Sequence, residues 1–358
     1  MGLSSCRRTR AFPPAPGSER PPLKTIRGIA YPRAALAGNP SDGYFGRTVS
    51  FAFTDFRALV ELAESDVIEI VPNERDHSRF GGIAELARDV GRYGYYGGLR
   101  LLKATVKRFH DHCLANALPL HDRNFSLRYT SDIPGQVGLA GSSAIVTACL
   151  RALMQFYAVD IPRPLQASLI LSIENDELGI PAGLQDRVAQ VYQGVVFMDF
   201  SRALMERQGH GNYESLDPGL LPPLYIAYRE TLAEGTEVFH NDIRARWNRG
   251  ESAVVEAMRF WADLAQDFRD ALTSGDHAAL GPLIDANFDR RRSIYRISPG
   301  NIEMIETARA HGASAHFCGS GGAIAGILPD PDHLDRLTAA LAPQGVRVLR
   351  PTLAPPQA

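Results

Sequence analysis

The sequence predicts an α+β protein built from two domains, and three observations lead to that prediction. The chain has 358 residues, which is more than one typical domain of about 100–200 residues holds. Segments with the alternation of strands and segments with helical periodicity follow one another in no strict order. A Pro- and Gly-rich stretch, SLDPGLLPP at residues 215–223, separates the two halves.

In the first half, short apolar runs bounded by turn residues predict five strands, and longer periodic runs predict four helices. The helix after Gly97 has the plainest signal, because Leu99, Leu102, Val106 and Phe109 form one apolar stripe. The expected strands cover residues 24–38, 47–56, 65–72, 123–134 and 194–200, and the expected helices cover 97–117, 142–157, 164–179 and 184–193.

The second half mixes helices with a small sheet. Two short strands are expected around the glycine turn within residues 313–328. Further strands are expected at 224–230 and 346–351, and helices at 237–248, 251–274, 276–291, 301–312 and 332–345.

The ends and the composition narrow the class of protein. Residues 1–24 are rich in Pro, Ser and Gly and lack the apolar stretch of a secretory signal, so we expect a disordered leader; residues 354–358 are expected to fray. A net charge of -2 gives no overall attraction to nucleic acid or to acidic membranes, and no apolar run reaches a membrane span. The arginine run 290–292 reads as a solvated helix face. Four cysteines without a C-x-x-C pair indicate reduced thiols in a cytoplasmic protein.

Three glycine-rich turns carry the functional signal: PRAALAGNPSDGYFG at residues 32–46, IPGQVGLAGSS at 133–143 and CGSGGAIAG at 318–326. None contains a Walker A motif, and none fits a dinucleotide fingerprint. The second turn directly precedes an expected helix. A helix cap by Ser142 or Ser143 would account for the hydroxyls but not for the glycines around them. An anion lying against the start of the helix would account for both, which favours a nucleotide phosphate site.

Carboxylates gather in SIENDELGIPAGLQDR, residues 172–187, between the second and third turns. Glu174 and Glu177 are three residues apart, so we expect them to share a helix face. Asp186 follows a Pro-x-Gly turn. For each carboxylate a plainer interpretation stays open: Glu174 as a solvated helix residue, and Asp186 as a helix cap or a surface partner of Arg187.

Phosphoryl transfer needs a metal, donors that hold the phosphates and a group that takes or orients the proton of the attacking hydroxyl. Magnesium prefers one or two protein oxygens together with phosphate and water. We therefore expect Ser143 and Glu174 to supply metal ligands. Asp186 is expected to face the hydroxyl, with Arg33 stabilising its ionised form.

The motifs resemble those of the GHMP kinases. IPGQVGLAGSSAIV is similar to the family's phosphate-loop motif, Pro-x-x-x-Gly-Leu-Gly-Ser-Ser-Ala, with Ala140 and Gly141 read as extending it by one residue. The first and third glycine turns resemble the family's first and third motifs, and ENDELGIPAGLQDR resembles its galactokinase-type segment. The resemblance spans nearly the whole chain outside the leader, in the family's order.

This resemblance implies a fold and a site. The fold is a ribosomal protein S5 domain 2-like N-terminal domain at residues 25–215 and a ferredoxin-like C-terminal domain at 222–352. ATP and Mg²⁺ are the implied cofactors, with Ser143 and Glu174 as metal ligands, Asp186 as the catalytic carboxylate and Arg33 as its partner. The implied phosphate-binding residues are Gly135, Gly138, Leu139, Ala140, Gly141, Ser142, Ser143 and Ala144. The implied substrate-binding residues are Asp42, Arg187, Gly319, Ser320, Gly321 and Gly322.

Stretches outside the shared motifs, among them AGLQDRVAQVYQGVVFMDF and NFDRRRSIY, resemble the branch of the family that acts on D-glucuronate. That branch implies transfer of the ATP γ-phosphoryl group to the anomeric hydroxyl. Another acceptor stays open (galactose, mannose, a heptose phosphate or an N-acetylhexosamine), as does a non-catalytic sugar sensor. The partners expected are ATP and a small sugar, with no nucleic acid and no membrane, in a monomer or homodimer.

A uronic acid needs a cation for its carboxylate, and arginine suits that role best. Arg187 and Arg47 are the candidates, each with a surface ion pair as the plainer alternative. Tyr93, Tyr95 and Tyr96 are candidates for contact with the sugar or the adenine, with a packed loop as the alternative.

Overall fold

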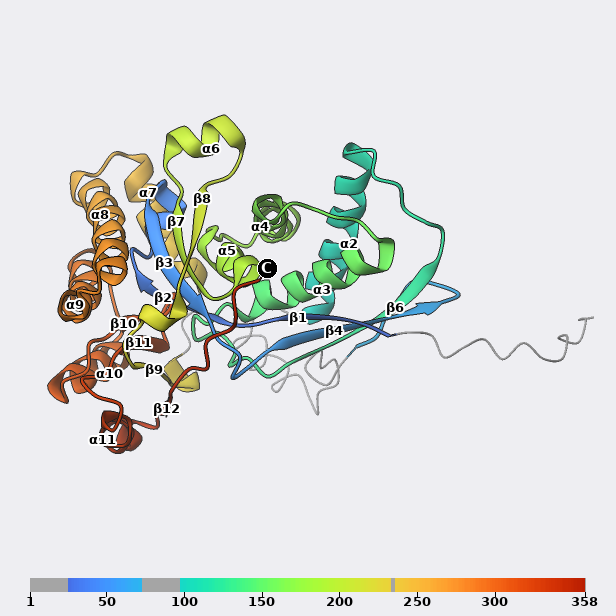
Figure 1. Cartoon of the computed structure of the whole chain (residues 1–358). Helices are drawn as coiled ribbons and strands as arrows, with labels where there is room; N and C mark the ends of the chain where they lie inside the picture. The colour runs from blue at the N-terminus through green and yellow to red at the C-terminus, as the bar shows by residue number, and fades with distance from the viewer. Residues whose placement is uncertain (1–24, 73–96, 233–235, 358) are drawn as a thin grey trace, which may run out of the picture.

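The computed structural model describes residues 25–72, 97–232 and 236–357, and within 236–241 it describes only the backbone. The expected leader, Cys6 and the three tyrosines between Tyr93 and Tyr96 lie outside these residues. The described chain forms three four-stranded sheets with helices packed on them (Figure 1).

The first sheet has the strand order β1-β4-β6-β5 and carries helices on one face. Residues alternate along β4, so that Val60 and Leu62 are fully buried beneath α3 while Glu61 points to the opposite face. Helix α2 packs beside α3 on the same side (Figure 1). The elements are β1 (Ile26–Ala30), β4 (Ala58–Ser65), β5 (Glu69–Ile70), β6 (Asn124–Ser131), α2 (Gly98–Ala115) and α3 (Gly141–Tyr157).

The second sheet is antiparallel, with the order β2-β3-β7-β8, and stands between α5 and α8 (Figure 1). Because helices cover both faces, β2, β3 and β7 are almost continuously buried and read as unbroken apolar runs. The elements are β2 (Arg33–Ala37), β3 (Arg47–Ala52), β7 (Val195–Asp199), β8 (Asn212–Leu216), α5 (Gln185–Tyr192) and α8 (Ser252–Ser274). Two further helices, α4 (Arg163–Ser172) and α6 (Arg202–Gln208), flank this half.

The third sheet has the order β10-β11-β9-β12, with neighbouring strands antiparallel. Along the chain its elements run β-α-β-β-α-β, which is the ferredoxin-like arrangement expected for the C-terminal domain. The elements are β9 (Leu224–Tyr228), α10 (Pro299–Ala310), β10 (His316–Phe317), β11 (Ala323–Ile327), α11 (His333–Leu341) and β12 (Arg347–Leu349).

Three helices between β9 and α10 return to the first half of the chain: α7 (Thr236–Asn248), α8 and α9 (His277–Ile294). Helix α8 packs on β3 and on the short turn Ser41–Tyr44. Asn287 of α9 accepts a hydrogen bond from the Gly38 amide (2.8 Å) and donates to the Asn39 carbonyl (3.1 Å). These contacts hold the first glycine turn against the second half of the chain.

The structure differs from the sequence-based expectation at several strands. The single strand expected at 24–38 is two strands, β1 and β2, which bend apart at Tyr31–Pro32 and enter different sheets. Proline at the bend cannot donate to a strand ladder, which explains the break. The strand expected at 65–72 is only Glu69–Ile70, while the long strand Ala58–Ser65 was missed.

The expectation that the C-terminal residues fray is wrong for residues 354–357. Ala354 is fully buried. The Gln357 amide donates to the Tyr192 carbonyl (2.9 Å), and the Gln357 carbonyl accepts a hydrogen bond from Arg163 (2.7 Å). Proline-rich composition suggested fraying, but hydrogen bonds to distant residues hold this tail in place.

Two further features concern the cysteines and the helices. Cys113, Cys149 and Cys318 are buried and unpaired with one another, and burial raises the pKa of the Cys149 and Cys318 thiols to about 12. Among the residues that the structure describes, no helix is both long and apolar enough to cross a membrane.

The packing of β1 on α3 predicts that Gly28→Ala destabilises the protein. A Cβ at Gly28 would lie 1.9 Å from the Ala148 carbonyl oxygen, so the strand and the helix would have to separate. We expect the free energy of unfolding in urea to fall by about 2 kcal/mol or more. The control is Gly281→Ala within α9, where the new Cβ would meet its nearest atom at 3.7 Å. The free energy of unfolding of this variant should rise by about 0.5–1 kcal/mol. Wild-type stability in Gly28→Ala would refute this packing.

Candidate active site

The phosphate-type loop before α3 is a strained turn with buried anchors. Gly138 and Ala140 adopt left-handed backbone conformations, with φ of 76° and 63°. Val137 and Leu139 are buried between them and fix the loop to the core. Helix α3 begins without a side-chain cap, so the hydroxyls of Ser142 and Ser143 do not cap it. The first amides of α3 remain available to an anion.

The two serines of this loop point in different directions. The Ser142 hydroxyl donates to Glu174 Oε1 (3.1 Å), whereas the Ser143 hydroxyl donates back to the Ala140 carbonyl (3.1 Å). Successive residues in a helical first turn point about 100° apart, so both cannot face Glu174. The structure thus brings Ser142, rather than Ser143, to Glu174. The loop then matches the GHMP motif without an extension, with Ala140 and Gly141 in place of its second Gly and first Ser.

Glu174 is fully buried within a π-helical turn, Ile173–Glu177, that follows α4. Its Oε2 accepts two hydrogen bonds from Arg187, one of them from Nε at 2.7 Å. Glu177 instead contacts Lys107 of α2 at 2.7 Å. The expectation that Glu174 and Glu177 share a helix face is therefore wrong, because the wider π turn rotates them apart.

Arg33 and Asp186 form the central ion pair. At the start of β2, Arg33 is almost completely buried, and its Nε donates to Asp186 Oδ1 at 2.7 Å. Its Nη1 donates to the Gly138 carbonyl (2.8 Å) and to the Cys318 carbonyl. One guanidinium therefore joins the start of α5, the phosphate loop and the second half of the chain.

The third glycine turn lies against the phosphate loop. A Cβ at Gly319 would lie 2.4 Å from the Gly138 carbonyl oxygen, so only glycine allows this approach. A Cβ at Gly138 would in turn lie 2.9 Å from the Ser320 amide nitrogen and 3.1 Å from the Gly321 carbonyl oxygen. The Gly322 amide donates to Asn301 (3.0 Å). The four residues expected to bind substrate thus belong to a turn that lies against the loop before α3.

Arg291 anchors this turn, contrary to the expected solvated arginine face. Its side chain is buried and donates to the Gly319 carbonyl (2.8 Å) and the Ser320 carbonyl (3.3 Å). Its neighbour Arg292 is exposed and pairs with Glu306. Charge runs are usually solvated, but Arg291 lies on the inner side of α9, where backbone carbonyls need donors.

Asp42 lies beside the start of α5, close enough to Asp186 for the two charges to interact. Its Oδ2 accepts a hydrogen bond from the Gln185 amide (3.2 Å). A Cβ at Gly183, the glycine of the Pro-x-Gly turn, would lie 2.0 Å from this oxygen, so the glycine permits the contact. Burial, and then the charge of Asp186, raise the pKa of Asp42 to about 6. The two carboxylates therefore share one site.

The two candidates for a carboxylate-binding arginine both pair with protein carboxylates. Arg187 is buried and bonds Glu174, the Gly183 carbonyl (2.9 Å) and Asp186 Oδ2 (3.3 Å). Burial alone would lower the pKa of Arg187, but its acidic neighbours raise it. Arg47, at the start of β3, contacts Asp199 at 3.4 Å and an exposed aspartate of α8 at 3.8 Å.

The sequence did not single out three residues near the first glycine turn. Asn287 accepts a hydrogen bond from Gly38, Arg244 lies over Tyr44, and Tyr295 belongs to the same buried cluster as Tyr44. The stretches HNDIRARW and NFDRRRSIY, which contain them, carry no spacing that predicts a site. Of the two tryptophans, Trp261 is fully buried in the core.

Comparisons with known proteins agree with this geometry. Residues 100–194 match the family described as GHMP kinases N terminal domain, and residues 268–346 match GHMP kinases C terminal. The chain belongs to the GHMP kinase family. It is 44% identical over 307 residues to Glucuronokinase 1 of Arabidopsis thaliana, covering 84% of each chain, and 44% identical to Probable glucuronokinase 2 of that plant.

The solved structures support the fold. Lactococcus lactis galactokinase complexed with galactose matches with a TM-score of 0.69 at 15% identity, covering 92% of this chain and 94% of that chain. The α+β two-domain fold expected from the motifs is thus confirmed.

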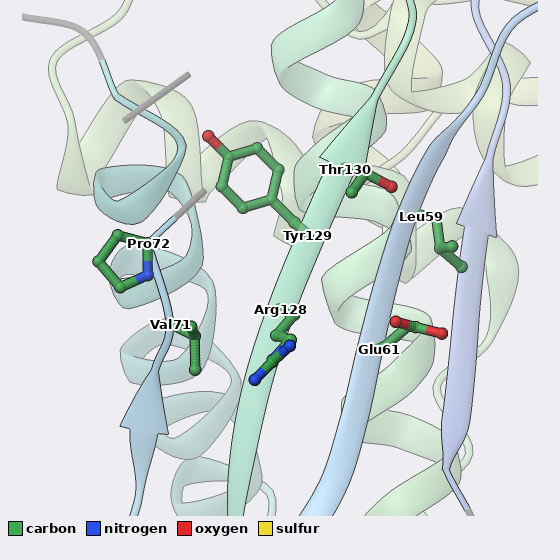
Figure 2. A pocket seen from close by; sticks show the side chains of 7 residues that line it. All are labelled: Leu59, Glu61, Val71, Pro72, Arg128, Tyr129 and Thr130. Atoms are coloured by element: carbon green, nitrogen blue, oxygen red, sulfur yellow. The ribbon is translucent and has the colours of Figure 1, made fainter. Parts of the chain in front are cut away.

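A separate hollow of about 250 Å³ lies on the face of the first sheet opposite α3 (Figure 2). Leu59 and Glu61 of β4 and Arg128 and Thr130 of β6 form its floor, beside Val71 and Pro72. None of the residues placed around Arg33 and Asp186 lines it.

The raised pKa of Asp42 predicts a pH-dependent effect of Asp42→Asn. The folded protein holds the proton of Asp42 more tightly than the unfolded chain does. The contribution of this proton to stability is therefore complete below about pH 4 and is lost as the pH rises through about 6. Asparagine does not ionise, so the variant does not lose this stability. We expect the stability of the variant relative to wild type to grow by about 1–2 kcal/mol between pH 4 and pH 7.5 in urea titrations. A difference that does not change with pH would contradict this.

Proposed function

We propose that this chain is a sugar 1-kinase that transfers the γ-phosphoryl group of ATP to the anomeric hydroxyl of D-glucuronate, giving glucuronate 1-phosphate. The observation that carries the proposal is its 44% identity to Glucuronokinase 1 across 84% of both chains. The buried Arg33–Asp186 pair beside a glycine-rich loop supports a phosphoryl-transfer site.

Asp186 is proposed to take or orient the proton of the attacking hydroxyl. A carboxylate does this only when ionised, and the Arg33 guanidinium at 2.7 Å favours the ionised form. Asp42, near Asp186, is proposed to accept hydrogen bonds from other sugar hydroxyls. Its raised pKa of about 6 still leaves this carboxylate mostly ionised at neutral pH, so it can accept those hydrogen bonds.

The ATP phosphates are proposed to lie against the loop from Gly135 to Ala144. The uncapped start of α3 offers backbone amides, and the helix dipole favours negative charge there. A Cβ at Gly135 would meet no atom within 4 Å, so that side of the loop is open. The turn Gly319–Gly322 covers the other side.

The donors beside this loop fit magnesium. Ser142 Oγ and Glu174 Oε1 are hard oxygen ligands 3.1 Å apart. Within the described ranges, no three His, Cys, Asp or Glu side chains gather as a metal site, which agrees with an ion that takes few protein ligands. Bound there, magnesium would neutralise phosphate charge. Arg187 balances Glu174 and Asp186 from the opposite side.

This arrangement predicts that the two serines differ in effect. Ser142→Ala should lower kcat about 100-fold and raise the magnesium concentration needed for half-maximal rate, because it removes a proposed ligand. Ser143→Ala should change both less than about 5-fold, since it loses one hydrogen bond to Ala140. Coupled ADP detection across a magnesium titration measures both. The reverse order would restore Ser143 as the ligand.

Two other functions remain as alternatives: a GHMP kinase for another sugar, such as galactose, mannose, a heptose phosphate or an N-acetylhexosamine, and a sugar sensor without catalysis. The pairing of Arg33 with Asp186 beside the phosphate loop favours an enzyme, since a sensor needs no such pair. A cytoplasmic location and a monomeric or homodimeric state stay predictions.

A panel of sugars with ATP tests the proposal. We expect D-glucuronate to give the highest kcat/KM, and Asp186→Asn to reduce kcat by about 10³-fold or more while ATP still binds by calorimetry. Turnover of galactose but not of glucuronate would select the other kinase. Sugar binding without ADP release for every sugar would select the sensor.

A further inference from the structure

Arg244 of α7 lies over the first glycine turn. Its guanidinium carbon is 4.1 Å from the centroid of the Tyr44 ring. Its Nη2 lies 3.0 Å from the position that a Cβ on Gly43 would occupy. Gly43 directly follows Asp42, so Arg244 lies over the neighbour of the residue proposed to contact sugar hydroxyls.

Arg244 differs from the other arginines considered for substrate binding. Arg187 and Arg47 are each paired with protein carboxylates. The side chain of Arg244 is exposed, and among the residues that the structure describes it has no hydrogen-bond or ion-pair partner. Stacking on the buried Tyr44 ring orients the guanidinium plane while its N–H donors remain free for a planar anion.

A second observation comes from Tyr295, which follows α9 and packs in the same cluster as Tyr44. Its hydroxyl is buried, and in the described part of the chain it has no hydrogen-bond partner. Burial raises the pKa of this hydroxyl, and so does the charge of Asp42, whereas Arg291 and Arg244 lower it. A buried hydroxyl without a partner is costly, and an oxygen of a bound ligand would satisfy it.

We propose that Arg244 binds the C6 carboxylate of a hexuronate, with the Tyr295 hydroxyl close enough to donate to the sugar, so that this cluster selects acid sugars over neutral ones. The inference rests on the proposed kinase function. In a hexuronate the anomeric carbon and the carbon that bears the carboxylate flank the ring oxygen. Asp186 and Arg244 would therefore bind neighbouring groups on either side of the ring oxygen, and Asp42 would contact other hydroxyls of the ring.

Arg187 is a poorer candidate for this role. To bind a substrate carboxylate it would have to leave Glu174 and Asp186, whose charges it balances. Removing one partner from a buried pair leaves an uncompensated charge, which is strongly unfavourable. Arg244 can bind an anion without breaking any ion pair in the described structure.

The test compares D-glucuronate with D-glucuronamide, which has the same ring but no charge at C6. Arg244→Gln should lower kcat/KM for glucuronate about 10- to 100-fold, mainly through KM, and change that for glucuronamide less than about 3-fold. Arg244→Lys should keep part of the preference for the acid. The KM for ATP should not change.

Arg202→Gln is the matched control, because Arg202 stacks at the same 4.1 Å on the adjacent Phe45 ring but pairs with Glu206. Arg202→Gln should leave kcat/KM for both substrates within about 2-fold of the wild-type values. If Arg244→Gln lowers kcat/KM equally for both substrates, or for neither, the assignment of Arg244 is overturned while the kinase function stands. A wild-type protein that phosphorylates no uronate overturns the proposed function, and the inference with it.

Discussion

The Arg33 guanidinium is the interaction on which the site depends. It binds Asp186, the Gly138 carbonyl and the Cys318 carbonyl, which belong to three segments more than a hundred residues apart from it in the sequence. Because the side chain is buried, losing it would leave a carboxylate and two carbonyls without their partner. The phosphate loop, the proposed catalytic carboxylate and the third glycine turn are thus positioned relative to one charged group.

Around Arg33 the charges alternate in sign. Asp186 lies between Arg33 and Arg187, and Arg187 lies between Asp186 and Glu174. Buried ion pairs contribute little to stability, because desolvation offsets their attraction, but each one strongly resists the loss of a single member. Such a chain fixes the geometry of two carboxylates that would otherwise repel. Among the described residues no arginine donates a hydrogen bond to Asp42, which agrees with its raised pKa.

Local signals in the sequence were sufficient for much of the site. Three glycines that permit a left-handed backbone or a close contact can be identified in the sequence, and they occur in the order of the family motifs: Gly138, Gly183 and Gly319. The direction of individual side chains was not visible. A one-residue shift along α3 exchanges Ser142 and Ser143, and a π turn separates Glu174 from Glu177. Both depend on packing between α3, α4 and α5, which periodicity does not describe.

By itself the sequence determined the α+β class, most helices of the second half and the identity of the phosphate loop, because these follow from local periodicity and backbone freedom. Only the tertiary structure decided which arginines form ion pairs with protein carboxylates and which one is available to a ligand. Arg187 bonds Glu174, 13 residues away, and Arg291 bonds a backbone carbonyl 28 residues away. Arg244 is carried by α7 onto Tyr44, which lies in the first half of the chain. These pairings depend on how the elements pack, so no local pattern records them.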